Sequence, residues 1–152
     1  MADMVDSKQE QLQPTQVMMI AAQSIGDVKK FGMKVFMPAM ITEMSQPNTE
    51  VKQFGNTLYI VHKGPDGKGY FKALNADTAR NYLENSYAFL DWAHKELGMK
   101  ILVTQFKDRT IFNIFKMIGI NPPWSGMWYQ AYKMKSGDDR IVLGLEPMRG
   151  KE

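Results

Sequence analysis

Two runs of β-branched and aromatic residues stand on either side of a turn sequence in the middle of the chain. Residues 57–62 (TLYIVH) and residues 69–74 (GYFKAL) have the composition of strands, and residues 64–67 (GPDG) between them are typical of a tight turn. A shorter strand at residues 51–54 precedes them and ends at the turn signal of residues 55–56 (GN). The pattern predicts three consecutive antiparallel strands.

The spacing of the apolar positions becomes helical after residue 77. Between Thr78 and Leu97, apolar residues recur three and four positions apart, which predicts a long helix with one buried face. Asn75 and Asp77 are candidates for its N-terminal cap, and Gly98 is placed to end it.

The rest of the chain predicts one more strand, one more helix and a final hairpin. Residues 100–106 (KILVTQF) read as a buried strand, and residues 108–118 carry apolar positions on one helical face before Gly119. Residues 127–134 and 140–145 read as the two arms of a hairpin. The predicted fold class is therefore α/β (α+β), with a mixed, mostly antiparallel sheet, a central βαβ crossover and two main helices.

The first 45 residues have a less regular pattern. Residues 17–28 fit a short amphipathic helix, whereas residues 34–41 (KVFMPAMI) read as a strand that Pro38 restricts to a sheet edge or interrupts. Eight of the thirteen methionines precede residue 45, and methionine suits adaptable contacts. We therefore predict an N-terminal helical arm at residues 1–45 that another chain orders, followed by a domain at residues 46–152.

Composition narrows the class of protein. The chain has 152 residues, of which 44% are apolar and 23% charged, as in a single globular domain. It has no cysteine, which excludes disulfides and thiolate metal sites, and its two histidines, His62 and His94, argue against an imidazole zinc site. No apolar run is long enough to predict a membrane span, and the polar residues 1–16 lack the pattern of a secretory signal.

The net charge of +3 is unevenly distributed. Residues 1–50 carry four lysines and six acidic residues, whereas residues 51–152 carry fifteen basic and ten acidic residues. The surplus in the second part is modest and forms no dense basic stripe. The sequence therefore argues against a dedicated nucleic-acid-binding protein.

The element order over residues 50–146 resembles that of the GNAT acyltransferase superfamily. The segment RTIFNIFKMIGI is similar to the family's helix that runs into a glycine-apolar pair, here Gly119-Ile120. The pattern also resembles a compact GNAT-like family of tailed phages that includes an internal virion protein of short-tailed coliphages. The resemblance implies a GNAT-like fold and, in active members, transfer of an acyl group from coenzyme A to an amine.

The same resemblance implies an opening in the sheet. Family members separate the strands that correspond to residues 69–74 and 100–106, and the cofactor enters between them. We expect the opening here to be narrowed by Phe106, Tyr70 or Phe71.

The stretch that corresponds to the family's coenzyme A loop departs from the family pattern. Enzymes of the family carry a Gln/Arg-x-x-Gly-x-Gly/Ala loop, whose backbone N–H groups hold the pyrophosphate at a helix N-terminus. Residues 74–80 (LNADTAR) stand at this place and contain no glycine. The carboxylate of Asp77 is expected to repel a phosphate there. Asn75, Ala76, Asp77 and Thr78 therefore form at most a degenerate cofactor site.

Two catalytic features of the family are also missing. Many members place a tyrosine, the general acid, four residues before the helix-ending glycine, and this position is Phe115, whose ring has no proton to donate. Residues 69–74, where a glutamate base often stands, contain no acidic residue. We predict no catalytic residue, no metal and no bound cofactor, with acetyl-CoA expected only if the chain is an enzyme.

Other titratable groups give weaker indications. His62 and Asp66 flank the first hairpin turn, but the sequence places no serine or cysteine beside them to complete a nucleophilic site. His94 lies among acidic residues on the long helix, which is typical of a solvated face. The adjacent Asp138 and Asp139 are typical of a turn, and their side chains are expected to point apart.

Two tryptophans, Trp124 and Trp128, follow the rigid segment at residues 121–123 (NPP). Large aromatic residues in such a loop are often interface anchors, and equally often a lid over the domain's own sheet. The sequence leaves both interpretations open. The candidate interface residues are Met18, Ile25, Phe36, Trp124 and Trp128.

Two functions from different classes remain. The first is a non-catalytic structural or interaction protein on a degenerate GNAT-like fold, a phage virion or morphogenesis component whose partners are other protein chains or a second copy of itself. The second is an acyl-CoA-dependent N-acyltransferase with an atypical coenzyme A site. The sequence favours the first because three family features are missing together. The expected location is the host cytoplasm or the virion.

Overall fold

The computed structural model describes residues 11–23, 32–106 and 109–146. In chain order, its elements are α2 (Pro14–Ala22), α4 (Met33–Met44), β1 (Thr49–Phe54), β2 (Thr57–Lys63), the 3-10 turn η1 (Pro65–Gly67), β3 (Lys68–Asn75), α5 (Ala79–Lys95), β4 (Ile101–Phe106), α6 (Arg109–Ile120), β5 (Trp128–Lys133) and β6 (Asp139–Gly144). This order confirms the predicted α/β (α+β) fold class.

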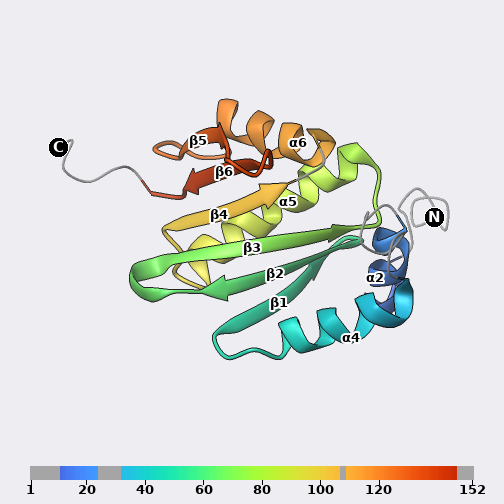
Figure 1. The fold of residues 1–152 in the computed structure, drawn as a ribbon. Helices are drawn as coiled ribbons and strands as arrows, with labels where there is room; N and C mark the ends of the chain where they lie inside the picture. The colour runs from blue at the N-terminus through green and yellow to red at the C-terminus, as the bar shows by residue number, and fades with distance from the viewer. Residues whose placement is uncertain (1–10, 24–31, 107–108, 147–152) are drawn as a thin grey trace, which may run out of the picture.

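The six strands form one mixed sheet (Figure 1). Its order is β1-β2-β3-β4-β6-β5, and every neighbouring pair is antiparallel except β3 and β4. Gly55 and Gly67 adopt positive φ values of 55° and 73° in the turns that join the first three strands. The long helix α5 carries the chain from β3 to β4, and this crossover makes these two strands parallel.

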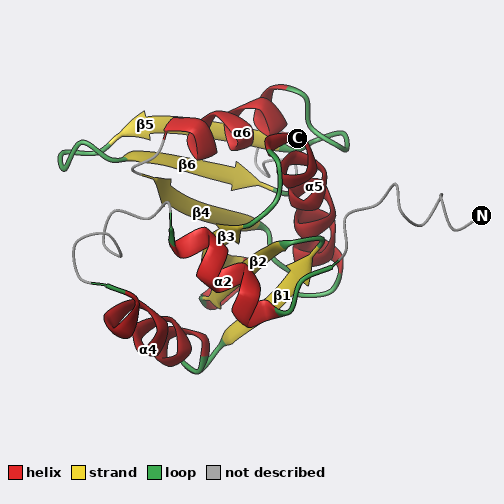
Figure 2. Ribbon diagram, turned by 90° about the vertical axis from the view of Figure 1, so that its right-hand side faces the viewer, coloured by secondary structure: helices red, strands yellow, loops and turns green. Residues whose placement is uncertain are grey.

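Helices cover the sheet from two sides (Figure 2). Helices α5 and α6 pack on one face, where the larger hydrophobic core lies. Tyr59, Phe71 and Phe89 are fully buried in this core, and the rings of Tyr59 and Phe89 stack with centroids 4.1 Å apart. Aromatic side chains of this size bury large areas and dominate the stabilisation of such a core.

Helices α2 and α4 lie against strands β1–β3 on the opposite face. Successive side chains of a strand point to opposite faces, so Leu58 and Ile60 face α2, whereas Tyr59 and Val61 face the larger core. The second hydrophobic core consists of Val17, Met18, Ala21, Met40, Leu58, Ile60 and Leu74. Val17, Met18 and Ala21 of the apolar stripe of α2 are therefore buried within the chain itself, whereas Ile20 is 43% exposed. The ordering of residues 1–45 by another chain stays a prediction.

The segment at residues 34–41 is helical, and its prediction as a strand is wrong. Pro38 lies inside α4, where it removes the hydrogen bond of one turn, and it faces solvent. The helix forms because its apolar positions share one face: Phe36, Met37 and Met44 pack against the second core, in which Met40 is buried. Tertiary packing thus outweighs the local cost of the proline.

Two predicted helix boundaries also change. The helix predicted at residues 17–28 spans Pro14–Ala22, with the proline at its first position, where a missing N–H costs no helical bond. Residues 24–31 lie outside the described chain. At the other end of the domain, Gly119 lies inside α6, which continues to Ile120.

Candidate functional site

The sheet opens between the carboxyl ends of its two parallel strands. Strands β3 and β4 pair over only three residue pairs, from Lys68–Ile101 to Tyr70–Val103. Beyond these pairs, β3 continues to Asn75 and β4 to Phe106 without pairing to each other. This arrangement confirms the predicted opening, and the carboxyl ends of parallel strands are where open α/β sheets bind ligands.

The aromatic residues predicted to narrow this opening lie on different sides of the sheet. Phe71 is fully buried in the larger core, with its ring 5.0 Å from that of Phe89. Tyr70 points to the opposite face and is 36% exposed. The side chain of Phe106 lies outside the described part of the structure. Among the described side chains, Phe71 therefore occupies the core face of the sheet directly after the last β3–β4 pair.

In the loop from β3 to α5, two backbone N–H groups donate to acceptors of the chain itself. The N–H of Ala76 donates to the carbonyl oxygen of Asn56, with a nitrogen–oxygen distance of 2.9 Å. The N–H of Asp77 donates to Oδ1 of Asn75 at 3.0 Å. In a pyrophosphate loop such N–H groups point at the anion. Here they are already engaged within the chain.

One backbone N–H group at the N-terminus of α5 is bound by a side chain. Thr78, and not Asn75 or Asp77, is the cap, since its Oγ1 accepts the N–H of Asn81 at 3.2 Å. The carboxylate of Asp77 instead accepts the backbone N–H of Asn56 at 2.8 Å and the side-chain amide of Asn85 at 2.7 Å. Asp77 therefore holds the β1–β2 turn and the second turn of α5 together.

The position of the family's general acid lies in the core. Phe115 is fully buried, and its ring centroid lies 5.2 Å from that of Phe71 and 5.9 Å from that of Tyr82. Both contacts have edge-on geometry, which favours aromatic packing. The side chain therefore serves the core and offers no proton to the opening.

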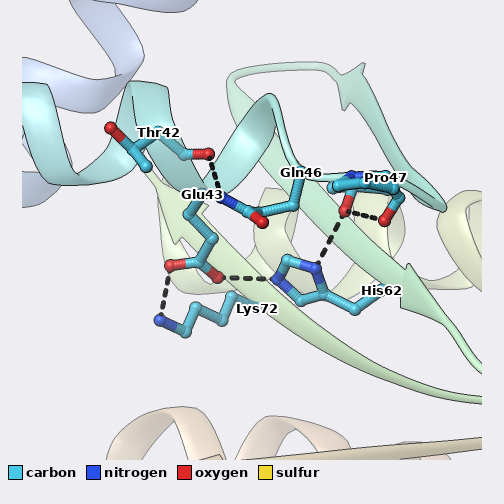
Figure 3. A network of polar contacts seen from close by, with 7 residues as sticks. Thr42, Glu43, Gln46, Pro47, His62 and Lys72 are labelled. Carbon is cyan, nitrogen blue, oxygen red and sulfur yellow. Dashed lines mark hydrogen bonds and ion pairs between the residues drawn. The ribbon is translucent and has the colours of Figure 1, made fainter.

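A polar network on the other face joins α4 to strands β1–β3 (Figure 3). The carboxylate of Glu43, near the end of α4, accepts hydrogen bonds from His62 Nε2 at 2.8 Å and Lys72 Nζ at 2.9 Å. The other ring nitrogen of His62, Nδ1, lies 3.1 Å from Oγ1 of Thr49, its partner on the neighbouring strand. Thr49, His62 and Glu43 thus form a hydroxyl–imidazole–carboxylate series. The sequence did not predict this series, because Glu43 belongs to the N-terminal segment that we expected to lie outside the domain.

This series has the order of a nucleophilic relay, but its surroundings give it a structural role. Thr49 donates its hydroxyl to the carbonyl oxygen of Pro47 at 3.2 Å, and both ring nitrogens of His62 face partners within the chain. Asp66, which flanks the same hairpin turn as His62 in the sequence, lies exposed in the η1 turn. The network therefore fastens α4 to the sheet.

The stabilisation that Glu43 contributes between α4 and the sheet depends on pH, because it requires the charged carboxylate. Burial raises the pKa of Glu43, but the hydrogen bonds and charges of Lys72 and His62 outweigh it and hold the pKa below the usual 4.5. A carboxyl with a lowered pKa stabilises the fold above its unfolded-state pKa and loses this effect as the pH falls through its folded-state pKa. Glu43→Gln should therefore lower the free energy of unfolding at neutral pH by about 1 kcal/mol at most, and the difference should shrink below pH 4.5.

Urea unfolding of both chains from neutral to acidic pH measures this difference. Glu50→Gln is the matched control, because Glu50 pairs with Lys63 at 3.3 Å but its side chain is 45% exposed. The control should change stability little at any pH. A loss in Glu43→Gln that stays constant down to low pH would show that charge is not involved.

Trp124 and Trp128 attach to the chain's own C-terminal end. Their indole N–H groups donate to the carbonyl oxygens of Leu145 at 2.9 Å and Glu146 at 3.0 Å, respectively. The ring of Trp124 also stacks on that of His94, at a centroid distance of 5.4 Å and an interplanar angle of 10°. Both tryptophans therefore have partners within the chain, and Trp128 is itself the first residue of β5. Their use as interface anchors stays a prediction.

The remaining titratable residues have internal partners. His94 lies between the ring of Trp124 and the carboxylate of Glu146, 3.4 Å from the latter, and its side chain is 28% exposed, so the predicted solvated face is partly covered at this residue. Asp138 accepts from Gln105 at 3.0 Å, while Asp139 is buried and pairs with a lysine of β5, so the two point apart as expected. Within the described ranges, no group of three His, Asp or Glu residues could hold a metal, and no helix could span a membrane.

The predicted interface residues of the N-terminal arm have different surroundings. Met18 is 2% exposed and belongs to the second core, against which Phe36 packs. Ile25 lies outside the described residues. The large apolar side chains that α2 and α4 expose are their neighbours Met19, Ile20, Val35 and Ile41.

Comparison with known proteins identifies the fold. No protein-family model and no curated protein matches the chain. Among solved structures, the chain is similar to the ribosomal-protein-S18-alanine N-acetyltransferase of Escherichia coli, with 12% identity, a TM-score of 0.53, and 94% of this chain and 96% of that chain covered. It is also similar to the N-acetyltransferase PseH of Campylobacter jejuni, with 9% identity, a TM-score of 0.52, and 88% and 92% covered. The chain therefore has the fold of GNAT N-acetyltransferases.

Proposed function

We propose that this chain is a non-catalytic interaction protein that uses the GNAT fold as a rigid platform. The observation that carries the proposal is the state of the loop before α5. The N–H groups of Ala76, Asp77 and Asn81 donate to acceptors of the chain itself. A coenzyme A pyrophosphate would have to displace these acceptors before it could bind there.

The energetic consequence is large. A dissociation constant in the micromolar range corresponds to about −8 kcal/mol. Without hydrogen bonds from these N–H groups to the pyrophosphate, contacts with the rest of the coenzyme would have to supply nearly all of this binding free energy. Phe115 adds to the argument, because a fully buried phenyl ring stands where the leaving thiolate would need an acid.

The outer faces of the N-terminal helices support a role in binding other chains. Met19, Ile20, Val35 and Ile41 are each more than 40% exposed. Exposed apolar side chains of this size gathered on two adjacent helices are typical of interaction surfaces. The resemblance to tailed-phage proteins makes another virion protein, or a second copy of this chain, the first partner to test.

The proposal is tested by titrating the full chain with coenzyme A and following the backbone amide resonances of the loop and of the first turn of α5. We expect the resonances of Ala76, Asp77 and Asn81 to stay unchanged at coenzyme A concentrations well above the micromolar range.

An acyl-CoA-dependent N-acyltransferase is the second candidate. The opening between β3 and β4 favours it, as does the fact that the reported structural neighbours are N-acetyltransferases. Under this function, acetyl-CoA would enter the opening between β3 and β4. Saturable shifts in the loop amides together with release of free coenzyme A in the presence of an amine would favour this candidate.

A further inference from the structure

One face of strands β4, β6 and β5 has no described helix packed on it. Helix α6 lies on the core face of these strands, and α2 and α4 lie on β1–β3. Figure 1 looks onto this face, and β4 is drawn there without a helix in front of it. Gln105, Arg140 and Tyr132 form a row across the face, because Arg140 is the direct cross-strand partner of the other two.

The guanidinium of Arg140 has only neutral polar partners in this row. Its Nη1 donates to the hydroxyl oxygen of Tyr132 at 3.4 Å, and its Nη2 donates to Oε1 of Gln105 at 3.3 Å. Its Nε is buried and has no hydrogen-bond partner. None of the ion pairs of the described residues includes Arg140. A half-buried guanidinium ordinarily pairs with an anion, since taking a lone charge out of water is costly.

The neighbours of Arg140 prepare it for an external anion. The hydroxyl oxygen of Tyr132 accepts from Arg140, which leaves its O–H to donate outward, and the side chain is 47% exposed. Both polar atoms of the Gln105 side chain are engaged. Its Oε1 accepts from Arg140, and its amide nitrogen donates to the carboxylate of Asp138 at 3.0 Å. Gln105 therefore positions the guanidinium. Asp138 limits how much additional negative charge the row accepts, which favours a carboxylate over a doubly charged phosphate.

We propose that Arg140 and Tyr132 form a binding site for a single carboxylate. The guanidinium supplies the charge and the phenol supplies a second donor, a combination that makes charge-assisted hydrogen bonds. Tyr132, but not Arg140, also lines a shallow depression of about 660 Å³ at the edge of the sheet. The site does not depend on whether coenzyme A binds.

The carboxylate can belong to a small organic acid or to an acidic side chain of another protein, and one experiment separates these sources. The full chain is titrated at low salt with N-acetylglycine, with its neutral amide N-acetylglycinamide, and with an acetylated, amidated peptide that contains one aspartate between alanines. The readout is the Nε–Hε resonance of Arg140. We expect saturation by N-acetylglycine in the range of roughly 1–10 mM and none by the neutral amide. A peptide that binds at least ten times more tightly assigns the site to a protein partner, and equal affinity assigns it to a free acid.

Variants decide whether the row itself is responsible. Arg140→Gln should abolish saturation, read from the amide resonances of β5, and Tyr132→Phe should weaken binding by about threefold to tenfold. Lys133→Gln is the matched control, because it removes the same charge from the adjacent residue of β5 on the opposite face, where Lys133 pairs with Asp139. If Arg140→Gln does not fold, comparing the affinity of Tyr132→Phe and of Lys133→Gln for N-acetylglycine still tests whether the row binds the carboxylate. Equal binding by the neutral amide, equal loss in Lys133→Gln, or no saturation by any probe would overturn the proposal.

Discussion

A chain that begins near Gln46, and therefore lacks α2 and α4, is expected to lose cooperative folding. Its sheet would expose Leu58, Ile60 and Leu74, which the two helices bury to 5% exposure or less in the full chain. Burying one large apolar side chain contributes about 1.5–3 kcal/mol. Three such losses approach the whole stability of a small domain, which is about 5–15 kcal/mol.

Circular dichroism and urea unfolding of the shortened and full chains measure this effect. The same test decides the predicted division of the chain at residue 45. A shortened chain that stays soluble and unfolds cooperatively would show that residues 46–152 form an independent domain. In that case the first 45 residues would be an arm whose main role lies with a partner.

Two neighbouring methionines provide a matched pair in the full chain. Met18 is 2% exposed and Met19 is 50% exposed. Met18→Ala should therefore lower the free energy of unfolding by about 2–5 kcal/mol. Met19→Ala, on the outer face of the same helix, should change it by about 0.5 kcal/mol at most. Similar effects for both variants would mean that α2 does not pack as described.

Any side chain at position 144 is expected to displace the indole ring of Trp128, which packs directly over Gly144. A Cβ atom added at Gly144 would lie 1.9 Å from Cε2 of Trp128 and 2.1 Å from its Nε1. The indole would have to move and would lose its hydrogen bond to the carbonyl oxygen of Glu146. Overpacking of this kind costs about 1–3 kcal/mol, and we expect Gly144→Ala at the upper end of this range and Gly144→Val beyond it.

The control is the same change in a chain that lacks the indole. In Trp128→Ala, the space beside residue 144 is open, so adding Gly144→Ala should cost much less than it does in the original chain. Urea unfolding of the four chains of this cycle gives the coupling between the two positions. An identical cost in both backgrounds would contradict the predicted clash.

Most of the domain from residue 50 onward could be predicted because its local signals agree. Turn residues, strand composition and helical spacing all point to the same elements between Thr49 and Ile120. The N-terminal part failed where the signals conflicted. Pro38 argued against a helix at residues 34–41, and only the second core, which no local pattern reveals, explains why α4 forms.

The candidate site shows the same limit. The absence of glycine before α5 and the phenylalanine at position 115 are visible in the sequence. The engagement of the loop N–H groups is not, because the acceptor for Ala76 is Asn56, twenty residues earlier. The Asp77 carboxylate was expected to point at a phosphate, but it binds Asn56 and Asn85, and only the fold brings these residues together.

Arg140 illustrates a third kind of limit. Its cross-strand partners, Gln105 and Tyr132, follow from strand register, and the register is fixed by the pairing of β4, β6 and β5. The sequence predicted the hairpin at residues 127–145 but not its pairing beside β4. An arginine without an acidic partner therefore became visible only in the structure.

The most direct test of the central claim is the coenzyme A titration of the full chain, followed residue by residue through its backbone amides. The account predicts that the resonances of Ala76, Asp77 and Asn81 do not move and that no saturable change occurs at concentrations of about 1 mM. Denatured chain titrated in parallel reports non-specific effects of the ligand. Saturable shifts of these three amides within this concentration range would contradict the expectation and favour the acyltransferase, most clearly with a dissociation constant near or below about 10 micromolar.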